Sequence, residues 1–574
     1  MYQYTDFDRK FVHARAAQYR DQLQRHLAGQ LPDDEFRPLR LQNGWYVQRH
    51  APMLRVAVPY GEINSKQLRA LATIARQHDL RDAGTAQERG GFGHFSTRQN
   101  LQFNWIPLDE SAEVMDLLAS VDMHGIQTSG NCIRNITTDA LAGIAADEVV
   151  DPRPYCEVLR QWSTLHPEFA FLPRKFKIAV TGAREDRAAI AWHDIGLQLL
   201  KNAAGEVGFK VFVGGGMGRT PVIGALINEF LPWQQILVYV EAIVRVYNRY
   251  GRRDNMYKAR IKILVKAEGQ KFFDAVNAEF AHVLADDPAG RAHLIPQAEF
   301  DRIAACFETP AGLRQPSLGF KATAESDAPL AYTRWLERNV HAHQLPGHRA
   351  VTLSLKRAGL PPGDVTADQM DAAAALADRY SQGELRVTHD QNLLLPWVHE
   401  SDLRALWQAA KTEGFSTPNI GFLTDMIACP GGDLCALANA RSIPVAAAIN
   451  ERFDDLDLLY DIGDIDLHIS GCINSCGHHH SGHIGILGVD KDGAEWYQIS
   501  LGGSDGSTLS GASVPGKVIG PSFAADEVTD AIEAVIETYR AQRTPGEHFV
   551  DTARRLGTAP FRAATDSVRQ TTAA

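Results

Sequence analysis

The feature that most constrains the fold is an internal repeat, in which the same order of segments occurs twice. Each copy begins with an alternating stretch typical of a strand, continues with an amphipathic helix and ends in a second strand-like stretch. The strands expected in the two copies are residues 54–59 and 95–105, and residues 351–355 and 385–397. A Gln-Asn-Leu tripeptide, present at 99–101 and at 391–393, sets the register between the copies.

A second pair of segments recurs in the same order further along each copy. Residues 176–182 resemble residues 465–471, and residues 208–216 resemble residues 496–503. Chance similarity between β-rich segments is the alternative explanation, and two separate pairs in one order argue against it. Each copy is therefore expected to hold a small α+β unit followed by a larger α/β unit.

The boundaries of these units follow from proline content and hydrophobic periodicity. Residues 308–348 hold four prolines and little periodicity, which is typical of a linker. Residues after Thr544 are polar and rich in alanine, and predict a loosely ordered tail. The expected units are an N-terminal extension (1–50), a first small unit (51–125), a first larger unit (126–307), the linker (308–348), a second small unit (349–412), a second larger unit (413–544) and the tail (545–574).

Composition limits the class of protein. A chain of 574 residues is too long for one hydrophobic core, so several domains are expected. A formal net charge of −11 argues against nucleic-acid binding as the main role, and it means that an anionic substrate needs a local basic pocket. The charged N-terminus lacks a signal-peptide core, and the sequence holds no apolar run of membrane-spanning length. We therefore expect a cytoplasmic protein that does not enter a membrane.

Four of the seven cysteines gather in a short part of the second copy. Cys429 and Cys435 are spaced as Cys-x5-Cys, and Cys472 and Cys476 as Cys-x3-Cys. Structural zinc sites usually repeat a shorter spacing, so the pattern favours an iron–sulfur cluster over zinc. A Pro-Gly-Gly turn follows Cys429, and a helix expected from Asp433 would place Cys435 in its first turn, where free amides stabilise anionic sulfur.

Positive residues occur at strand-like positions far from the cysteines. They are Arg98, Arg134, Lys175 and Lys177. On a strand, Lys175 and Lys177 point to the same face and would converge on one anion, although each taken singly is typical of a solvated surface charge. The histidines that follow the last cysteine, His478, His479, His480 and His483, suit metal binding, proton supply or hydrogen bonds to a cofactor equally well.

Taken together, these motifs resemble those of the sulfite/nitrite reductase hemoproteins. The resemblance is carried by Cys-x5-Cys, by Gly-Cys-x-Asn-x-Cys-Gly, by the duplication and by Leu-Pro-Arg-Lys-Phe-Lys at 172–177, and it extends from about residue 50 to 540. It implies an internally duplicated α+β fold with two ferredoxin-like half-domains (the small units) and two α/β domains for siroheme and an iron–sulfur cluster (the larger units). It also implies siroheme and a [4Fe-4S] cluster as cofactors.

The resemblance also assigns residues. It implies that Cys429, Cys435, Cys472 and Cys476 ligate the cluster and that Cys476 shares its sulfur with the siroheme iron. It implies that Arg98, Arg134, Lys175 and Lys177 line the anion pocket. The siroheme contacts that it implies are Gln99, Asn135, Arg260, Lys262 and Asn474. The sequence departs from the family at Ile473, where proline is frequent, and at His478, where arginine or glutamine is frequent.

The expected activity is the six-electron reduction of sulfite, as in the assimilatory sulfite reductases. Reduction of nitrite to ammonia is the nearest alternative, and two lysines in the pocket favour sulfite because its charge is higher. A cobalamin-pathway monooxygenase on the same fold and a zinc-stabilised scaffold are more distant alternatives. Residues 214–218 lack the dinucleotide-binding spacing, so electrons are expected from a ferredoxin or a flavoprotein partner. For Cys132, an inert core thiol is favoured over a modified one.

Overall fold

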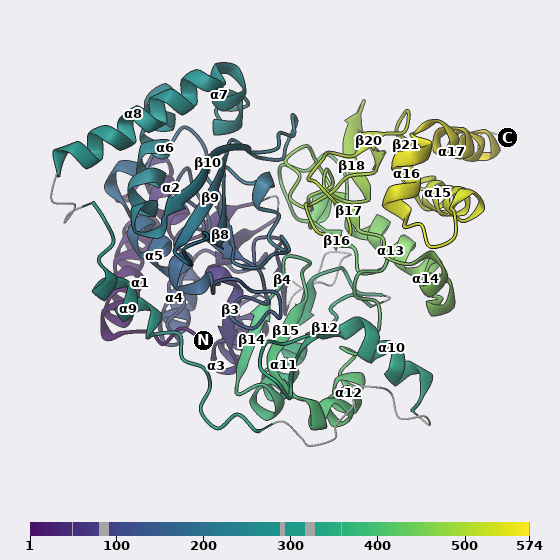
Figure 1. The fold of residues 1–574 in the computed structure, drawn as a ribbon, viewed down its shortest axis with the longest axis horizontal. Helices are drawn as coiled ribbons and strands as arrows, with labels where there is room; N and C mark the ends of the chain where they lie inside the picture. Colours follow the sequence, from purple (N-terminus) through teal and green to yellow (C-terminus); the bar gives the residue numbers. More distant parts are fainter. Residues whose placement is uncertain (49, 80–90, 288–292, 316–327, 358, 573–574) are drawn as a thin grey trace.

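The computed structural model describes residues 1–48, 50–79, 91–287, 293–315, 328–357 and 359–572. The chain forms two small and two larger sheet domains, in the order that the repeat predicts (Figure 1). No helix within these described ranges combines the length and the apolar character that crossing a bilayer requires.

Two five-stranded sheets form the small domains, and each takes one edge strand from the other copy. The first has the order β1-β2-β5-β4-β13 and the second β11-β12-β15-β14-β3. The strands of the first sheet are β1 Trp45–Val47, β2 Pro52–Val56, β5 Leu101–Phe103, β4 Phe92–Phe95 and β13 Asp364–Thr366. Those of the second are β11 Val340–His341, β12 His348–Leu353, β15 Leu393–His399, β14 Glu384–Val387 and β3 Glu62–Asn64. The exchange of β3 and β13 fixes the two small domains to each other.

Helices cover these sheets. They are α1 Asp6–Leu27, α2 Asp33–Gln42, α3 Ser65–Gln77 and α4 Ser111–Ala119 in the first copy, and α10 Leu330–Asn339, α11 Ala367–Tyr380 and α12 Leu403–Thr412 in the second. Thr366 and Gln369 form a capping box at the start of α11, and Asn64 and Gln67 form the matching one on α3. Helices α3 and α11 pack together, and one continuous hydrophobic core contains residues from both small domains.

The larger domains also match each other. Their sheets have the orders β10-β9-β8-β7-β6 and β16-β17-β18-β19-β20, with β21 beside β19. In both, the first three matching strands are parallel and the next pairing is antiparallel. The strands are β6 Thr137–Thr138, β7 Ile178–Thr181, β8 Ile195–Lys201, β9 Val207–Val213 and β10 Ala225–Pro232, and then β16 Ile427–Ala428, β17 Leu467–Ser470, β18 Ile484–Lys491, β19 Ala494–Leu501, β20 Lys517–Val518 and β21 Phe523–Ala524.

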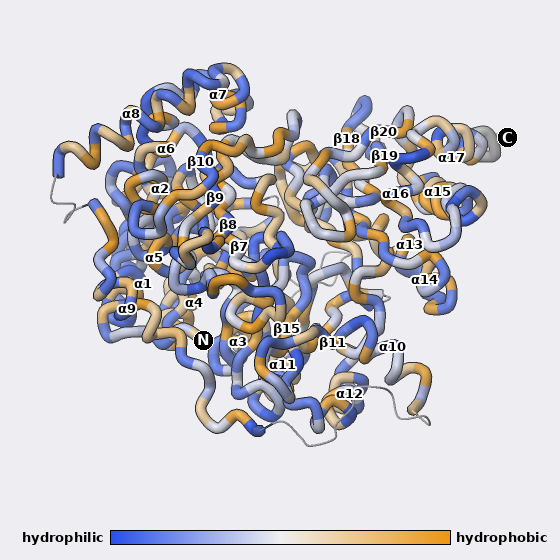
Figure 2. Tube along the Cα trace, in the orientation of Figure 1, coloured by the Kyte–Doolittle hydropathy of each residue, from blue (hydrophilic) through white to orange (hydrophobic). Residues whose placement is uncertain are grey.

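Helices pack around each larger sheet. They are α5 Arg153–Ser163, α6 Ile236–Tyr250, α7 Ile261–Glu268, α8 Gln270–Asp286 and α9 Gln297–Ala304, and then α13 Ile443–Arg452, α14 Leu456–Ile462, α15 Val528–Gln542, α16 Phe549–Leu556 and α17 Ala559–Thr572. Figure 2 shows hydrophilic and hydrophobic residues alternating along α8 at the edge of the molecule. Separate hydrophobic cores lie under the two larger sheets.

The shared Gln-Asn-Leu tripeptide places two glutamines that join the copies. Gln99 Nε2 donates to the Val387 carbonyl at 3.0 Å, and its Oε1 accepts the Thr138 amide at 3.2 Å. Gln391 makes the reciprocal contacts with the Phe95 carbonyl and the Ala428 amide. Both glutamines have positive φ angles, 56° and 62°, because each sits in the tight turn between two strands.

Three sequence-based expectations are corrected by the structure. Residues 95–105 and 385–397 are not single strands: each runs from the end of one strand through a turn into the second strand of a hairpin, so Arg98 lies in a turn. The tail after Thr544 is not loose, because it forms α16 and α17 and buries Phe549 and Phe561. Within the expected linker, α10 and β11 belong to the second small domain, and residues 316–327 of it lie outside the described residues.

Candidate active site

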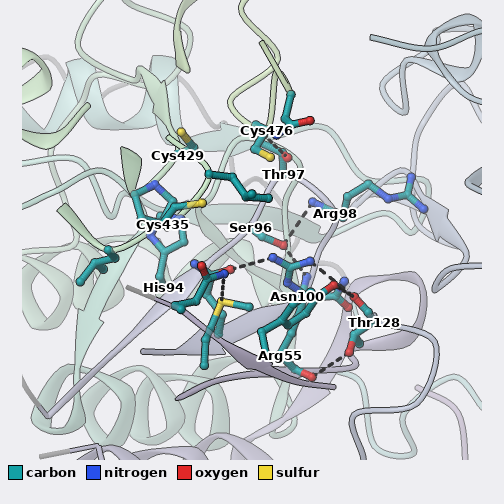
Figure 3. Close-up of a pocket in the computed structure, with 18 of the residues that line it drawn as sticks. Arg55, His94, Ser96, Thr97, Arg98, Asn100, Thr128, Cys429, Cys435 and Cys476 are labelled. Carbon is teal, nitrogen blue, oxygen red and sulfur yellow. Dashed lines mark hydrogen bonds between the residues drawn. The ribbon is translucent and has the colours of Figure 1, made fainter. Parts of the chain in front are cut away.

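A cavity of about 210 Å³ lies where the first small domain meets both larger domains, and it gathers most of the residues singled out from the sequence. Its lining includes all four clustered cysteines together with the cationic side chains of the first copy. Figure 3 shows Cys429, Cys435 and Cys476 on one side of this pocket and Arg55 and Thr128 on another. The predicted residues that line it are Arg98, Arg134, Asn135, Lys175, Lys177, Cys429, Cys435, Cys472, Asn474 and Cys476.

The cysteines are presented by the ends of two parallel strands. Cys429 directly follows β16, and Cys472 and Cys476 follow β17. The turn after Cys429 is a short 3-10 turn over Gly431–Asp433, in which Gly431 has a φ of 59°. The expected α-helix at Asp433 is therefore wrong: Leu434 leaves the helical conformation, and Cys435 is held by a bond from its amide to the Gly431 carbonyl.

Two glycines allow the cysteine loops to approach the protein backbone. A Cβ on Gly477 would lie 1.9 Å from the Ile469 carbonyl oxygen, and one on Gly471 would lie 2.5 Å from that of Ala440. Each glycine therefore lies directly against the backbone of a neighbouring strand or turn. These close contacts hold the segment that contains Cys429 and Cys435 against the segment that contains Cys472 and Cys476.

The sulfur atoms face hydrogen-bond donors. The Gly471 amide donates to Cys429 Sγ at 3.2 Å, and Asn474 Nδ2 donates to Cys472 Sγ at 3.5 Å. Burial raises the pKa of Cys429 to about 12 and also raises those of Cys435 and Cys472. To hold an iron–sulfur cluster, these thiols would have to lose their protons, and the donors would stabilise the resulting thiolates. Among the described residues, no group of three or more His, Cys, Asp or Glu side chains is placed to hold a single metal ion.

The two predicted arginines lie on the cavity wall and are bound to backbone groups. Arg98 Nη1 donates to Thr137 Oγ1 and its Nη2 to the Asn135 carbonyl, both at 2.7 Å. Figure 3 shows the Arg98 side chain directed away from the cysteines. Arg134 donates to the carbonyls of Thr128 and Gly130 at 2.7 Å each. These carbonyls fix the orientation of both guanidinium groups.

The two lysines carry charge that the protein leaves largely uncompensated. Burial lowers the pKa of Lys175 to about 8; Cys476 partly opposes this effect, and the charges of Arg134 and Arg260 add to it. Burial also holds the pKa of Lys177 well below its usual value, with further contributions from Arg98 and Lys175. An anion in the cavity would relieve this repulsion, so the site is electrostatically prepared for a negatively charged ligand.

Three other predicted residues lie outside the cavity lining. Gln99 is engaged in the contacts between the two copies described above. Arg260 pairs with Asp194 at 2.7 Å, and Asp194 in turn accepts the amide of Lys177 at 2.8 Å. Lys262 donates to the carbonyls of Met217 and Thr220, both at 2.6 Å, and so fastens the loop after β9. In this structure these three side chains support the cavity wall from behind.

Sequence reasoning missed three residues of the cavity. Arg55 donates to Gln102 at 3.1 Å, and its buried Nε has no hydrogen-bond partner within the described residues. Arg174 lies beside Lys175. Burial raises the pKa of Tyr46, but Arg134 and Arg55 outweigh it and bring the pKa to about 8. A signal was present for Arg55, because it stands within an otherwise apolar strand, β2.

The histidines after Cys476 have separate positions. His479 is buried, and its Nε2 has no hydrogen-bond partner among the residues that the structure describes. His480 Nε2 contacts the Gly218 carbonyl at 2.9 Å. His483 Nδ1 accepts the Asp466 amide, so its Nε2 carries the proton given to Ser510 at 2.8 Å. They therefore do not act as one cluster. Cys132 lies in a wider surface cavity beside Arg134, and its thiol contacts the Ser129 carbonyl.

Comparisons with known proteins agree with this geometry. A family model described as "Nitrite and sulphite reductase 4Fe-4S domain" matches residues 129–284 and 423–571, and one described as "Nitrite/Sulfite reductase ferredoxin-like half domain" matches residues 46–121 and 353–412. Together these matches cover more than half of the chain.

Individual relatives include both kinds of reductase. The assimilatory ferredoxin-dependent nitrite reductase of Haloferax mediterranei is 28% identical over 87% of this chain and 80% of its own length. Sulfite reductase [ferredoxin] 1 of Mycolicibacterium paratuberculosis is 26% identical over 80% and 76%. The solved structure of the Mycobacterium tuberculosis NirA protein has the same fold, with a TM-score of 0.73, 24% identity and coverage of 93% and 92%. The chain belongs to the nitrite and sulfite reductase family, whose cofactors are siroheme and a [4Fe-4S] cluster.

Proposed function

We propose that this protein is an assimilatory sulfite reductase that converts sulfite to sulfide with six electrons. The observation that carries the proposal is the single cavity in which Arg55, Arg98, Arg134, Arg174, Lys175 and Lys177 lie beside four cysteines. So many cations around a small space suit a dianion better than a monoanion, because each buried positive charge needs compensation.

The cysteines are the residues that would hold the cluster, and Cys476 would join it to the siroheme. When bound, this pair supplies the electrons and an iron that binds the central atom of the substrate. Cys476 and Asn474 are exposed in the cavity, which leaves them accessible to a large cofactor.

The cationic residues bind and orient the substrate. Reduction of sulfite consumes six electrons and eight protons and yields hydrogen sulfide and three water molecules. Arg134 and Arg55 are fixed donors for substrate oxygens, and Lys175 and Lys177 offset charge and give protons to the oxygens that leave as water. The pKa of Lys175, lowered to about 8, makes this residue an effective proton donor near neutral pH, and the pKa of Lys177 is lowered in the same direction.

The electron donor in this proposal is a ferredoxin. The names of the nitrite reductase from Haloferax and of the sulfite reductase from Mycolicibacterium both include ferredoxin, and this chain covers most of the length of each. A flavoprotein subunit is the alternative donor.

Reduction of nitrite to ammonia is the second candidate function. It is favoured by the similarity to nitrite reductases, including the chloroplastic ferredoxin–nitrite reductase of Arabidopsis thaliana at 27% identity. It uses the same cofactors and also consumes six electrons and eight protons, giving ammonium and two water molecules.

The test is an absorption spectrum with iron and acid-labile sulfide analysis, followed by assays of both anions with a reduced dye as electron donor. We expect a chlorin-type red band, cluster and heme iron, and a higher kcat/KM for sulfite than for nitrite. A higher kcat/KM for nitrite would replace the first candidate with the second. A protein without siroheme would contradict both.

The pH dependence of KM follows from the lysines. Lys175 is charged below its pKa of about 8 and loses its charge as the pH rises through that value. Anion binding should therefore weaken above pH 8, and KM should rise by up to about tenfold per pH unit. Nitrite, whose own charge is constant in this range, is the substrate for the measurement. A KM that stays constant between pH 7 and 9.5 would contradict a binding role for the lysine.

A further inference from the structure

The internal duplication creates a second cavity, of about 220 Å³, at the position that matches the first. Its lining comes from the turn between β14 and β15 and from the ends of β6 and β17, the counterparts of elements that build the first cavity. The two cavities are therefore related by the repeat, and their residues can be compared position by position.

The comparison shows that the positive charges have been replaced. Asp390 precedes Gln391 as Arg98 precedes Gln99, and Asp466 precedes β17 as Lys177 precedes β7. The backbone contact is retained, since the Asp466 amide donates to His483 Nδ1 where the Lys177 amide donates to Asp194. Asp390 lines the second cavity, and its carboxylate there disfavours an anion.

The cluster ligands have also been replaced. Asp139 directly follows β6 as Cys429 directly follows β16, and it accepts a hydrogen bond from Arg187 Nε at 2.6 Å. Arg187 also pairs with Asp147 at 2.7 Å. Ion-paired side chains therefore lie where the repeat would place the first pair of cluster ligands. The second cavity is thus not a second cluster site, and a different function has to be considered for it.

The second cavity is lined by groups that exchange protons. They are Asp390, His193, His341, His389, His468 and His478, with Asp505 and the ion-paired Asp139 in the same lining. His193 is 3% exposed and His468 is 8% exposed. Each bonds a carbonyl through Nδ1, and within the described residues neither has a partner for Nε2. Both imidazoles are therefore buried and face the cavity, with one ring nitrogen hydrogen-bonded and the other available.

The two cavities share a wall. Arg98 and Lys177 line the first cavity, and they are the charged groups that act most strongly on the imidazole of His193, which lines the second. His389 spans the same wall, with Nδ1 at 3.1 Å from the carbonyl of Thr97 and Nε2 at 3.0 Å from that of Thr138. Thr97 itself lines the first cavity.

We propose that the second cavity supplies protons to the substrate pocket, passing them from Asp390 through the imidazoles to His193 and then to Lys177. The inference rests on the proposed function, because either six-electron reduction consumes eight protons for each substrate molecule. When the Lys177 ammonium gives a proton to a departing oxygen, it becomes a neutral amine. His193, whose Nδ1 stays on the Ala189 carbonyl, takes up a proton from the cavity side at Nε2 and passes it to the amine. This restores the Lys177 ammonium and the neutral ring, and each proton delivered in this way comes from solvent through the cavity.

The electrostatics of the cavity support this route. The side chain of Asp390 is exposed to the cavity, and desolvation by the surrounding protein, together with the charges of Asp425, Asp466 and Asp505 and against that of Lys356, raises its pKa to about 7. Asp390 therefore exchanges protons near neutral pH, which suits a group that loads from solvent. Burial lowers the pKa values of His341 and His468 to about 4, so these rings are neutral and can both accept and donate a proton.

The experiment uses the holoenzyme with saturating reduced dye and whichever anion it reduces. For Asp390→Asn and His193→Gln we expect kcat to fall at least tenfold at pH 8 and less at pH 6, because residual routes depend on solvent protons. KM and the siroheme and iron contents should stay within twofold of wild type. The solvent deuterium isotope effect on kcat should rise, because proton transfer becomes rate-limiting.

Matched controls are Asp79→Asn, a buried carboxyl whose pKa is also raised to about 7, and His343→Gln, a buried histidine. Neither lines either cavity, and both variants should keep the wild-type isotope effect. Unchanged kcat in Asp390→Asn, or an equal loss at both pH values with an unchanged isotope effect, would overturn the inference. If that variant loses its cofactors, His468→Gln carries the same test. A wild-type enzyme that reduces neither anion would refute the proposed function instead, and the inference with it.

Discussion

Replacing Cys476 with serine is expected to abolish the reduction of both sulfite and nitrite. Cys476 is the cysteine that lies exposed in the cavity, opposite the cationic wall, and its backbone carbonyl is held by Thr97 Oγ1 at 2.9 Å. A hydroxyl group is a poor ligand for iron compared with a thiolate. Because this residue would join the cluster to the siroheme, we expect kcat to fall by at least about 10³-fold.

The measurement separates loss of the ligand from loss of the fold. Iron, acid-labile sulfide and the visible spectrum should change together with activity, while the far-UV circular dichroism spectrum should match that of the wild type. Cys156→Ser is the control, since Cys156 is buried in α5 outside the cavity. Wild-type turnover in Cys476→Ser would exclude the ligand role.

Replacing Lys177 with alanine is expected to lower kcat/KM by about 10²- to 10³-fold while leaving the cofactors bound. Lys177 is buried close to three other positively charged side chains, those of Arg98, Lys175 and Arg260. Removing it weakens substrate binding and also removes a proton donor, so both KM and kcat should change. Lys175→Ala should also lower kcat/KM, because Lys175 lines the same cavity and burial lowers its pKa to about 8.

Two further variants serve as controls for the Lys177→Ala result. Lys177→Arg keeps the charge and should recover part of the affinity but less of kcat, because a guanidinium is a weak proton donor. Lys201→Ala, at the end of β8, should behave as wild type. Loss of siroheme in Lys177→Ala would show instead that the lysine is structural.

The local patterns of the sequence predicted much of the fold and part of the site. The Gln-Asn-Leu repeat predicted matching copies, and the reciprocal contacts of Gln99 and Gln391 confirm this register. The amphipathic helix of each copy was correctly predicted and is observed as α3 and α11, because amphipathic spacing depends on residues within a few positions of each other. The spacing of the cysteines predicted one common site, and all four line one cavity.

Errors arose where distant segments decide the conformation. The stretch around Arg98 has the alternation of a strand, but pairing with other strands makes it a hairpin turn. The polar tail forms helices because Phe549 and Phe561 pack into the core under the second larger sheet. Composition alone does not show that such a core is within reach.

The sequence by itself determined the duplication, the cysteine set and the surplus of basic residues near two of the repeated strands. The tertiary structure decided which cations face the cavity: Arg55 and Arg174 do, whereas Arg260 pairs with Asp194 and Lys262 fastens a loop. It also decided that Arg98 and Asp390, at matching positions of the repeat, lie on different cavities. The physical reason is that the sequence fixes which ionisable group each position carries. How deeply that group is buried, and which groups it contacts, depends on segments that are hundreds of residues away.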